Sequence, residues 1–165
     1  LIRSGLASVS WTFSAGTFLF EICLLFIWNE VHFYVCHSAM HTQFLFAHAH
    51  HIHHESVTPT PFSTYSMHWI EAVALGSVMV LIIPWHVFSV YSLLALPIVS
   101  LIGNSIGHAN YELFPQRAEA GAYAPSREHG LHHRKASGNF GFLLPFFDRL
   151  FRTSIRGSIS NRSTS

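Results

Sequence analysis

Most of the histidines in this sequence fall into three groups whose spacing suits metal binding. Two groups read HxxHH, at residues 50–54 and 129–133, and a third reads HxxxH, at residues 37–41. On a helix, positions i, i+3 and i+4 share one face, so each HxxHH motif can direct three imidazoles to one point, and HxxxH can direct two. The eight histidines of these motifs are His37, His41, His50, His53, His54, His129, His132 and His133.

The number of imidazoles indicates more than one metal ion. Neutral imidazole suits zinc, copper, iron and nickel, and a structural zinc ion takes four ligands. His68 and His108, at the two ends of an apolar segment, join the motif histidines as candidate ligands. This set predicts two ions held close together, a pair that can bind dioxygen and supply oxidising equivalents for attack on an unactivated C–H bond. The remaining histidines are assigned to packing or solvent: His32, His48, His51 and His86.

The composition indicates a membrane protein. Only 10% of the residues are charged, against roughly 25% in soluble domains. No Lys or Arg stands between Arg3 and Arg117, and this stretch contains long apolar runs. The formal net charge of +1, without a basic patch, argues against a nucleic-acid partner.

Two apolar segments are expected to cross the bilayer. Residues 9–28 are interrupted only by Glu21, and about 20 such residues span a membrane. The helical pattern continues to His41, which would stand just past one face, while Glu21 is expected to face the bundle. Residues 71–106 are divided by Pro84, which favours a helical hairpin that turns at "PWH" over a single kinked helix. Such a hairpin returns His108 to the face where His68 begins it.

These observations predict an all-α integral membrane helical bundle with a histidine-rich di-metal site on its cytoplasmic face. Eight of the nine Lys and Arg residues lie beyond residue 113, which makes that side cytoplasmic. We expect one domain over residues 1–153, which starts without Met and could lack upstream helices, and a flexible tail over residues 154–165. Residues 141–151 are expected to lie along the interface.

Several stretches resemble the fatty acid hydroxylase/sterol desaturase superfamily of membrane-bound di-metal oxygenases, from about residue 30 to residue 153. The stretch "EVHFYVCHSAMH" and the nine-residue step from His41 to His50 follow its pattern. "STYSMHWIE" resembles the segment that carries a further histidine before a glutamate, and "HGLHHRKASGNFGFLLPFFDRLFRT" resembles the closing motif with Gly138, Asn139 and Asp148. "GNSIGHANYELFP" is similar to the C4-methylsterol oxidase branch.

The sequence also departs from the family pattern. Ser38 stands where the family often has Arg, Trp69 where it usually has Pro, and Arg152 where it has Gly. These departures weaken an assignment to the sterol branch. Some family members place a second histidine four residues after the one that matches His108, and Glu112 stands there in this chain. Either this carboxylate is a ligand or the site has one histidine fewer.

The resemblance implies a di-iron centre that uses dioxygen and two electrons to hydroxylate or desaturate a lipid, either sterol-like or fatty acyl. Zinc could occupy the same imidazoles. The electrons would come from a ferredoxin-like protein or a small haem cytochrome, because the chain has no flavin or nicotinamide fingerprint. The membrane would be the endoplasmic reticulum of a eukaryote or the inner membrane of a bacterium. The implied ligands are His37, His41, His50, His53, His54, His68, His108, His129, His132 and His133, with Glu112 as a possible further ligand.

Two other functions remain open at the level of sequence. A membrane metal transporter without redox chemistry would need ligands near the bilayer midplane, where only Glu21 and His86 are candidates. A bis-histidine haem protein would need paired histidines inside facing helices, which the tight HxxHH groups suit poorly.

Overall fold

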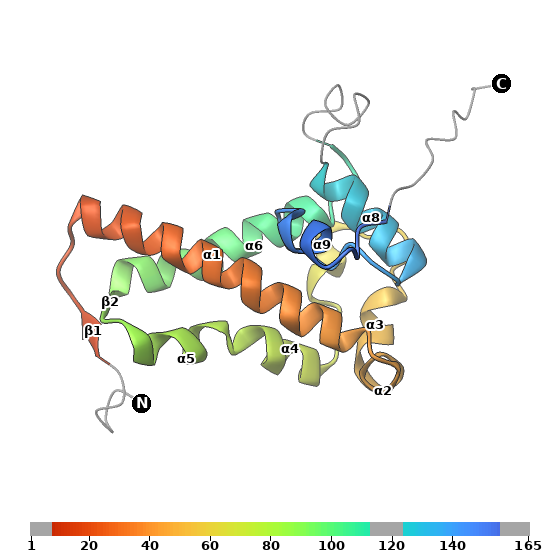
Figure 1. Cartoon of the computed structure of the whole chain (residues 1–165), viewed down its shortest axis with the longest axis horizontal. Helices are drawn as coiled ribbons and strands as arrows, with labels where there is room; N and C mark the ends of the chain where they lie inside the picture. The colour runs from red at the N-terminus through yellow and green to blue at the C-terminus, as the bar shows by residue number, and fades with distance from the viewer. Residues whose placement is uncertain (1–7, 113–123, 156–165) are drawn as a thin grey trace.

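The computed structural model describes residues 8–112 and 124–155, and this part of the chain is mostly helical (Figure 1). The predicted flexible tail therefore lies largely outside the described residues, as do residues 113–123. The elements in chain order are β1 (Val9–Ser10), α1 (Ala15–Met40), α2 (Gln43–Leu45), the π-helical turn η1 (Phe46–His50), α3 (His51–His54), the 3-10 helix η2 (Pro61–Tyr65), α4 (Trp69–Gly76), α5 (Val78–Ile82), the 3-10 turn η3 (Ile83–Trp85), β2 (Phe88–Ser89), α6 (Val90–Gly107), α8 (Pro125–Lys135) and α9 (Phe146–Leu150).

Three helical segments form a long arm (Figure 1). The chain runs out along α4 and α5, turns through η3, and returns along α6, while α1 contacts all three helices. The predicted hairpin and its turn at Pro84 are thus confirmed. At the turn, β1 and β2 pair as a two-stranded parallel sheet. The buried core of the arm consists of Leu25, Phe88, Leu93 and Leu96.

Glu21 makes hydrogen bonds at the end of the arm where the hairpin turns. Its carboxylate accepts hydrogen bonds from the Ser89 backbone N–H at 3.0 and 3.2 Å, and His86 Nε2 lies 3.2 Å from one of its oxygens. Ser89 is the N-cap of α6, where a negative charge is favourable because the first backbone N–H groups have no partner within the helix. Glu21 is 1% exposed, so the prediction that it faces the bundle is confirmed.

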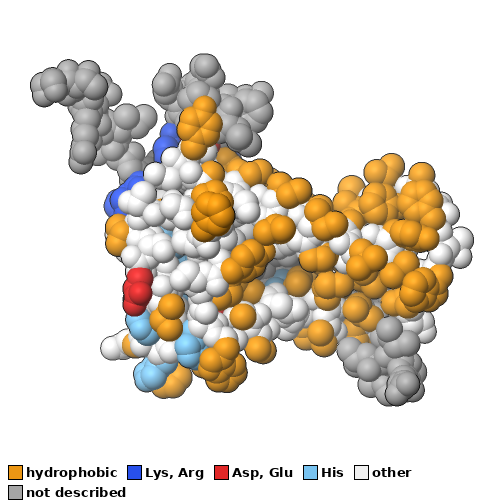
Figure 2. Space-filling view, turned by 180° about the vertical axis from the view of Figure 1, so that it is seen from behind, with side chains coloured by type: hydrophobic (Ala, Val, Ile, Leu, Met, Phe, Trp, Pro, Cys, Tyr) orange, Lys and Arg blue, Asp and Glu red, His pale blue; other side chains and the backbone are white. Residues whose placement is uncertain are grey.

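The outer surface of the arm is apolar. Figure 2 shows hydrophobic side chains gathered over this part of the molecule, with histidine and charged side chains at the other end. By length and composition, α1 and α6 could each cross a membrane, and the apolar segment Trp69–Trp85 is shorter. An apolar surface of this extent is unusual for a protein surrounded by water. It suggests a membrane location for the arm.

The end of α1 opposite the arm's turn is where the chain changes direction. His41 is the C-cap of α1, and the chain then re-enters helix through α2 and the π-helical turn η1. A π-turn holds one residue more than an α-turn and is frequent at functional sites. This turn ends at His50, and α3 continues directly from it to His54. The short helices thus carry the first HxxHH motif back toward the end of α1.

Candidate metal centre

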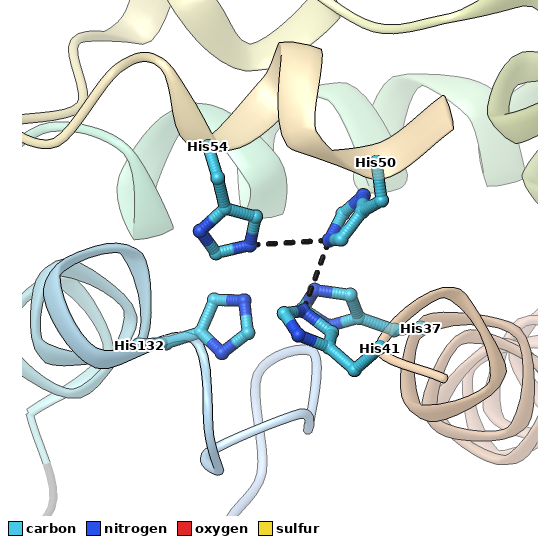
Figure 3. Close-up of side chains that lie close together, drawn as sticks. All are labelled: His37, His41, His50, His54 and His132. Atoms are coloured by element: carbon cyan, nitrogen blue, oxygen red, sulfur yellow. Dashed lines mark hydrogen bonds between the residues drawn. The ribbon is translucent and has the colours of Figure 1, made fainter. Parts of the chain in front are cut away.

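Nine of the ten predicted histidine ligands form two groups at one end of the molecule, and within each group the ligand atoms all lie within 4.8 Å of one another. Figure 3 shows the rings of the first group pointing toward one another from the end of α1, from η1 and α3, and from α8. Group A consists of His37, His41, His50, His54 and His132. Group B consists of His53, His108, His129 and His133.

The structure corrects one expectation about the HxxHH motifs. Each motif was expected to direct three imidazoles to one point, but each divides its histidines between the groups. The first motif gives its i and i+4 residues to group A and His53 to group B, and the second gives i and i+4 to group B and His132 to group A. The physical reason is that positions i+3 and i+4 project about 100° apart around a helix axis. Each motif therefore serves both groups.

Backbone carbonyls fix the tautomer of six of the nine imidazoles. A carbonyl oxygen can only accept a hydrogen bond, so the Nδ1 facing it carries the proton and the Nε2 keeps its lone pair. The bonds run from Nδ1 of His37 to Phe140 O (2.9 Å), His41 to Ala136 O (3.0 Å), His53 to Ser66 O (3.2 Å), His54 to His133 O (3.4 Å), His108 to Asn104 O (2.9 Å) and His132 to Gly138 O (2.7 Å).

The Nε2 lone pairs converge at spacings that fit a shared ion. In group B, Nε2 of His53 and Nε2 of His108 lie 3.2 Å apart, and neither carries a proton to share. In group A, His50 Nε2 lies 3.0 Å from His41 Nε2 and 3.2 Å from His54 Nε2, and a single proton could satisfy only one of these contacts. Two nitrogens bound to one ion at 2.0–2.1 Å stand about 3.0–3.4 Å apart for angles near 90–110°.

One further nitrogen supports this fit. His132 Nε2 is buried and, among the described residues, has no hydrogen-bond partner. Buried polar atoms are rarely left without a partner, because an unpaired one loses its hydration without compensation. A cation among the five imidazoles would supply the missing partner. The donor set and its geometry therefore suit a metal ion in each group.

Burial keeps these imidazoles neutral, which is the form that binds metal. Burial and, to a lesser extent, the neighbouring His54 imidazole lower the pKa of His41 to about 4. Burial likewise lowers the pKa of His53 to about 3, together with the nearby His108 imidazole. At neutral pH both side chains are uncharged, because desolvation disfavours the imidazolium form. No proton has to leave before such a nitrogen can bind a cation.

Glu71 is a site residue that the sequence analysis did not assign. Its Oε1 lies 3.0 Å from His50 Nδ1, and both side chains are almost completely buried. A carboxylate behind a histidine ligand orients the ring and makes its other nitrogen a better donor. Glu71 lies in the first turn of α4. The signal in the sequence was the glutamate of "STYSMHWIE", which was quoted only as part of a family segment.

A loop after α8 supplies three of the carbonyl acceptors of group A. We call residues 136–140 the acceptor loop, because the carbonyls of Ala136, Gly138 and Phe140 face His41, His132 and His37. Two of its residues have left-handed backbone conformations, Ala136 with φ of 50° and Asn139 with φ of 56°. This unusual backbone course is what turns successive carbonyls toward the imidazoles.

Neighbouring side chains hold the acceptor loop in place. The Asp148 carboxylate accepts hydrogen bonds from the backbone N–H groups of Phe140 and Gly141, each at 2.8 Å. The Asn139 side chain donates to the Glu128 carbonyl at 3.2 Å. A Cβ atom on Gly138 would overlap the backbone of Thr153, so no larger residue fits there without movement. These contacts explain why Gly138, Asn139 and Asp148 stand in the closing motif.

Two of the predicted site residues lie outside both groups. His68 is the N-cap of α4, where its Nδ1 accepts a hydrogen bond from the Ile70 backbone N–H at 3.3 Å. Glu112 accepts a hydrogen bond from the Arg127 backbone N–H, near the start of α8. The structure thus brings neither side chain to the converging Nε2 atoms. His48 and His51 are exposed, as expected of residues assigned to solvent.

Comparison with known proteins decides the family. The sequence profile described as "Fatty acid hydroxylase" matches residues 22–153, a range that contains both histidine groups. The chain belongs to the fatty acid hydroxylase family. The superfamily resemblance is therefore confirmed, and its C4-methylsterol oxidase branch is not. Members of the fatty acid hydroxylase family are known as metal-dependent, and the two groups are able to bind metal.

Curated relatives in plants extend this result. "Protein CER1-like 1" of Arabidopsis thaliana is 30% identical over 140 residues, which cover 76% of this chain and 22% of that protein. "Very-long-chain aldehyde decarbonylase GL1-11" and "GL1-8" of Oryza sativa are each 29% identical over 160 residues, which cover 92% of this chain and 57% of theirs. The chain thus spans only part of the length of these relatives. No solved structure matches the chain. The family and these relatives support an enzyme that acts on lipids.

Proposed function

We propose that this chain is the metal-binding catalytic part of a membrane enzyme that oxidises a lipid with dioxygen. The observation that carries the proposal is the pair of adjacent groups whose Nε2 lone pairs converge. Groups A and B would each hold one iron ion through their nine imidazoles. Such a pair supplies the binding and reduction of dioxygen, with two electrons from a separate ferredoxin-like or small haem protein. Zinc would fit the same imidazoles but provides no redox chemistry.

The protein's own groups prepare this site and take no other chemical part. The backbone carbonyls hold six imidazoles in one tautomer, so each presents a lone pair in a fixed direction. Burial keeps bulk water away from the ligands and keeps the imidazoles uncharged. Glu71 is the carboxyl group that contacts His50. No acid or base beyond the metal ligands is required, because the cofactor carries the chemistry.

The apolar arm beside the site supports a membrane lipid as the substrate. We propose that the arm lies in the bilayer with the histidine end at its cytoplasmic face, so that the attacked carbon lies near the polar end of the lipid. Relatives named as very-long-chain aldehyde decarbonylases favour a long aliphatic chain over a sterol ring. Hydroxylation and desaturation are both within the reach of such a site.

The reaction is tested with protein reconstituted in lipid with an electron donor under isotopically labelled dioxygen. We expect two iron ions per chain and a lipid product that carries one labelled hydroxyl, or a desaturated product without label. Product formation without dioxygen, or at the same rate with zinc in place of iron, would exclude an oxygenase. A metal-binding or transport protein would then be the better assignment.

The proposed orientation is tested by labelling single cysteines. Cys23 and Cys36 are first replaced by Ser, and cysteine is then placed at Thr58 near the histidine end or at Trp85 in the turn of the arm. Trp85 is 84% exposed, so a cysteine there is accessible to the reagent. We expect Thr58→Cys to react only from the cytoplasmic side and Trp85→Cys only from the opposite side. Reaction of both from the same side would contradict the orientation.

A further inference from the structure

A cavity of about 280 Å³ lies inside the arm, and none of the described residues that line it belongs to group A or group B. Its walls come from α1, η2, α4, α5 and α6. Phe33 lines it and packs against the His37 ring with 5.0 Å between ring centroids. Asn104 also lines it, and the Asn104 carbonyl accepts the hydrogen bond from His108. Two residues of the cavity wall thus each contact a histidine, Phe33 one in group A and Asn104 one in group B. Figure 2 shows a hollow where the apolar arm meets the histidine end.

Two buried polar side chains on the cavity wall have no partner. Thr64 is 2% exposed and Asn29 is 6% exposed, and neither side chain makes a hydrogen bond within the part of the chain that the structure describes. Other polar side chains on the wall are paired: His32 Nε2 lies 3.0 Å from Ser77 Oγ, and the Asn104 amide donates to the Ser100 carbonyl at 2.9 Å. An unpaired buried polar atom is costly, so Thr64 Oγ1 indicates a polar partner, and the Asn29 amide on the same wall offers a second hydrogen-bonding group.

The kind of side chain restricts the chemistry of that partner. A threonine hydroxyl and an asparagine amide are neutral groups that can both donate and accept. None of the described residues that line the cavity is Lys, Arg, Asp or Glu. A carboxylate or phosphate buried there would lack a counter-ion, which is unfavourable. A hydroxyl or carbonyl oxygen carries no such cost, and the rest of the wall is largely apolar.

We propose that this cavity binds the end of a lipid that bears a neutral oxygen, a hydroxyl or a carbonyl, with Thr64 and Asn29 as its hydrogen-bonding partners. The inference rests on the proposed function and adds the substrate class to it. Thr64 lies two residues before Ser66, whose carbonyl holds His53, so an oxygen bound at Thr64 is close to the metal-binding end of the cavity. The apolar residues of α4, α5 and α6 then accommodate the adjoining carbon chain.

The first test measures binding rather than turnover. Zinc-loaded protein in lipid nanodiscs is titrated with stearyl alcohol and, separately, with octadecane, which differ only in the hydroxyl. We expect the wild-type protein to prefer the alcohol. Thr64→Val and Asn29→Leu keep the side-chain size, and each should weaken alcohol binding about 3- to 10-fold, the value of one net hydrogen bond, and leave the alkane unchanged. Equal binding of the two probes to the wild-type protein, or unchanged alcohol binding in both variants, would overturn the inference.

A second variant tests the place of binding. A Cβ atom added at Gly76, on the cavity wall, meets nothing within 4 Å, so Gly76→Leu adds bulk without displacing the protein. Gly16 also has nothing within 4 Å and does not line the cavity, which makes Gly16→Leu the matched control. We expect Gly76→Leu to weaken both probes and Gly16→Leu to weaken neither. Unchanged binding in Gly76→Leu would overturn the location.

The cavity inference and the proposed oxygenase function are contradicted by different results. Incorporation of labelled oxygen into lipid, together with no preference for the alcohol, would remove the cavity inference and leave the oxygenase in place. A preference for the alcohol that depends on Thr64, in an iron-loaded protein that consumes no dioxygen, would instead remove the oxygenase. Metal content is measured in every variant, and we expect it to be unchanged, because Thr64, Asn29 and Gly76 belong to neither histidine group.

Discussion

Groups A and B are both built from the two HxxHH motifs, yet they differ in composition. Each receives an i, i+4 pair from one HxxHH motif and a single histidine from the other. The difference comes from the two long helices. The end of α1 adds His37 and His41 to group A, whereas the end of α6 adds only His108 to group B. Group A therefore has five imidazoles and group B has four.

A carboxylate adds a second difference between groups A and B. Glu71 stands behind His50 of group A, while group B contains no carboxylate among the described residues. Catalytic metal sites keep a coordination position for water or substrate, whereas structural sites are closed by protein ligands. The comparison indicates that an ion in group A would be held more tightly and that an ion in group B would be more open to an incoming molecule. The following predictions test this difference, from the largest expected effect to the smallest.

Loss of the histidine that each motif gives to the opposite group should have the largest effect. His53→Ala removes one of the four imidazoles of group B, and His132→Ala removes one from group A. Because the proposed reaction needs both ions with their full ligand sets, either change should reduce activity by more than about 100-fold even where the ion is retained, which is above the range for changes outside the direct ligands. Turnover of lipid under matched iron loading measures the effect. Activity above a tenth of wild type in either variant would contradict the assignment of these ligands.

Metal retention should separate the two groups directly. His37→Ala leaves four imidazoles in group A, the number that group B has in the wild type, whereas His108→Ala leaves only three in group B. After dialysis against a chelator, we expect His37→Ala to keep close to two ions per chain and His108→Ala to keep close to one. Elemental analysis gives the count. The reverse order would show that the larger group is not the tighter one.

Glu71→Gln should have an intermediate effect, confined to group A. Glutamine keeps the shape of the side chain but replaces the carboxyl group beside His50 with an amide that cannot ionise. Changes to such supporting partners typically cost 10- to 100-fold in metal affinity. We expect a loss in that range for one ion, measured by competition with a chelator, while the other ion is unaffected. Glu55→Gln is the control, because Glu55 is exposed and follows the same motif. Equal behaviour of the two variants would remove the role of Glu71.

His51→Ala should have the smallest effect. His51 belongs to the same run of histidines as His50 and His53 but is exposed. A substitution on the surface away from such features usually changes the free energy of unfolding by no more than about 0.5 kcal/mol. Metal content and activity should therefore match the wild type. A loss comparable with that of His53→Ala would mean that the register of α3 is wrong.

The sequence predicted the features that depend on local geometry. The HxxHH and HxxxH spacings identify the eight motif histidines of the two groups because helical periodicity is local, and Pro84 locates the turn of the hairpin because proline disfavours helix continuation. The division of each motif between two groups was missed, because it depends on where helices from distant parts of the chain meet. His68 was predicted as a ligand because it stands at one end of the hairpin, but its side chain caps α4.

Contacts between segments that are far apart in the chain could not be predicted from the sequence. The carbonyl that accepts the hydrogen bond from His37 lies on Phe140, more than a hundred residues later in the chain. Nothing in the residue type of Phe140 encodes this contact, because every residue has a backbone carbonyl. Glu71 carried a weak signal, but a single carboxylate at the start of an apolar helix is equally compatible with helix capping.

The acceptor loop has a consequence for how this protein tolerates change. Its three acceptors are backbone oxygens, so no side-chain replacement at Ala136 or Phe140 can delete them. Random variation would therefore leave the acceptors intact and act only on their placement. Substitutions at Gly138, Asn139 and Asp148 would displace the acceptors, although none of these residues touches an Nε2 atom of either group. A library of variants should therefore show intolerance at these positions, although none of them supplies a metal ligand.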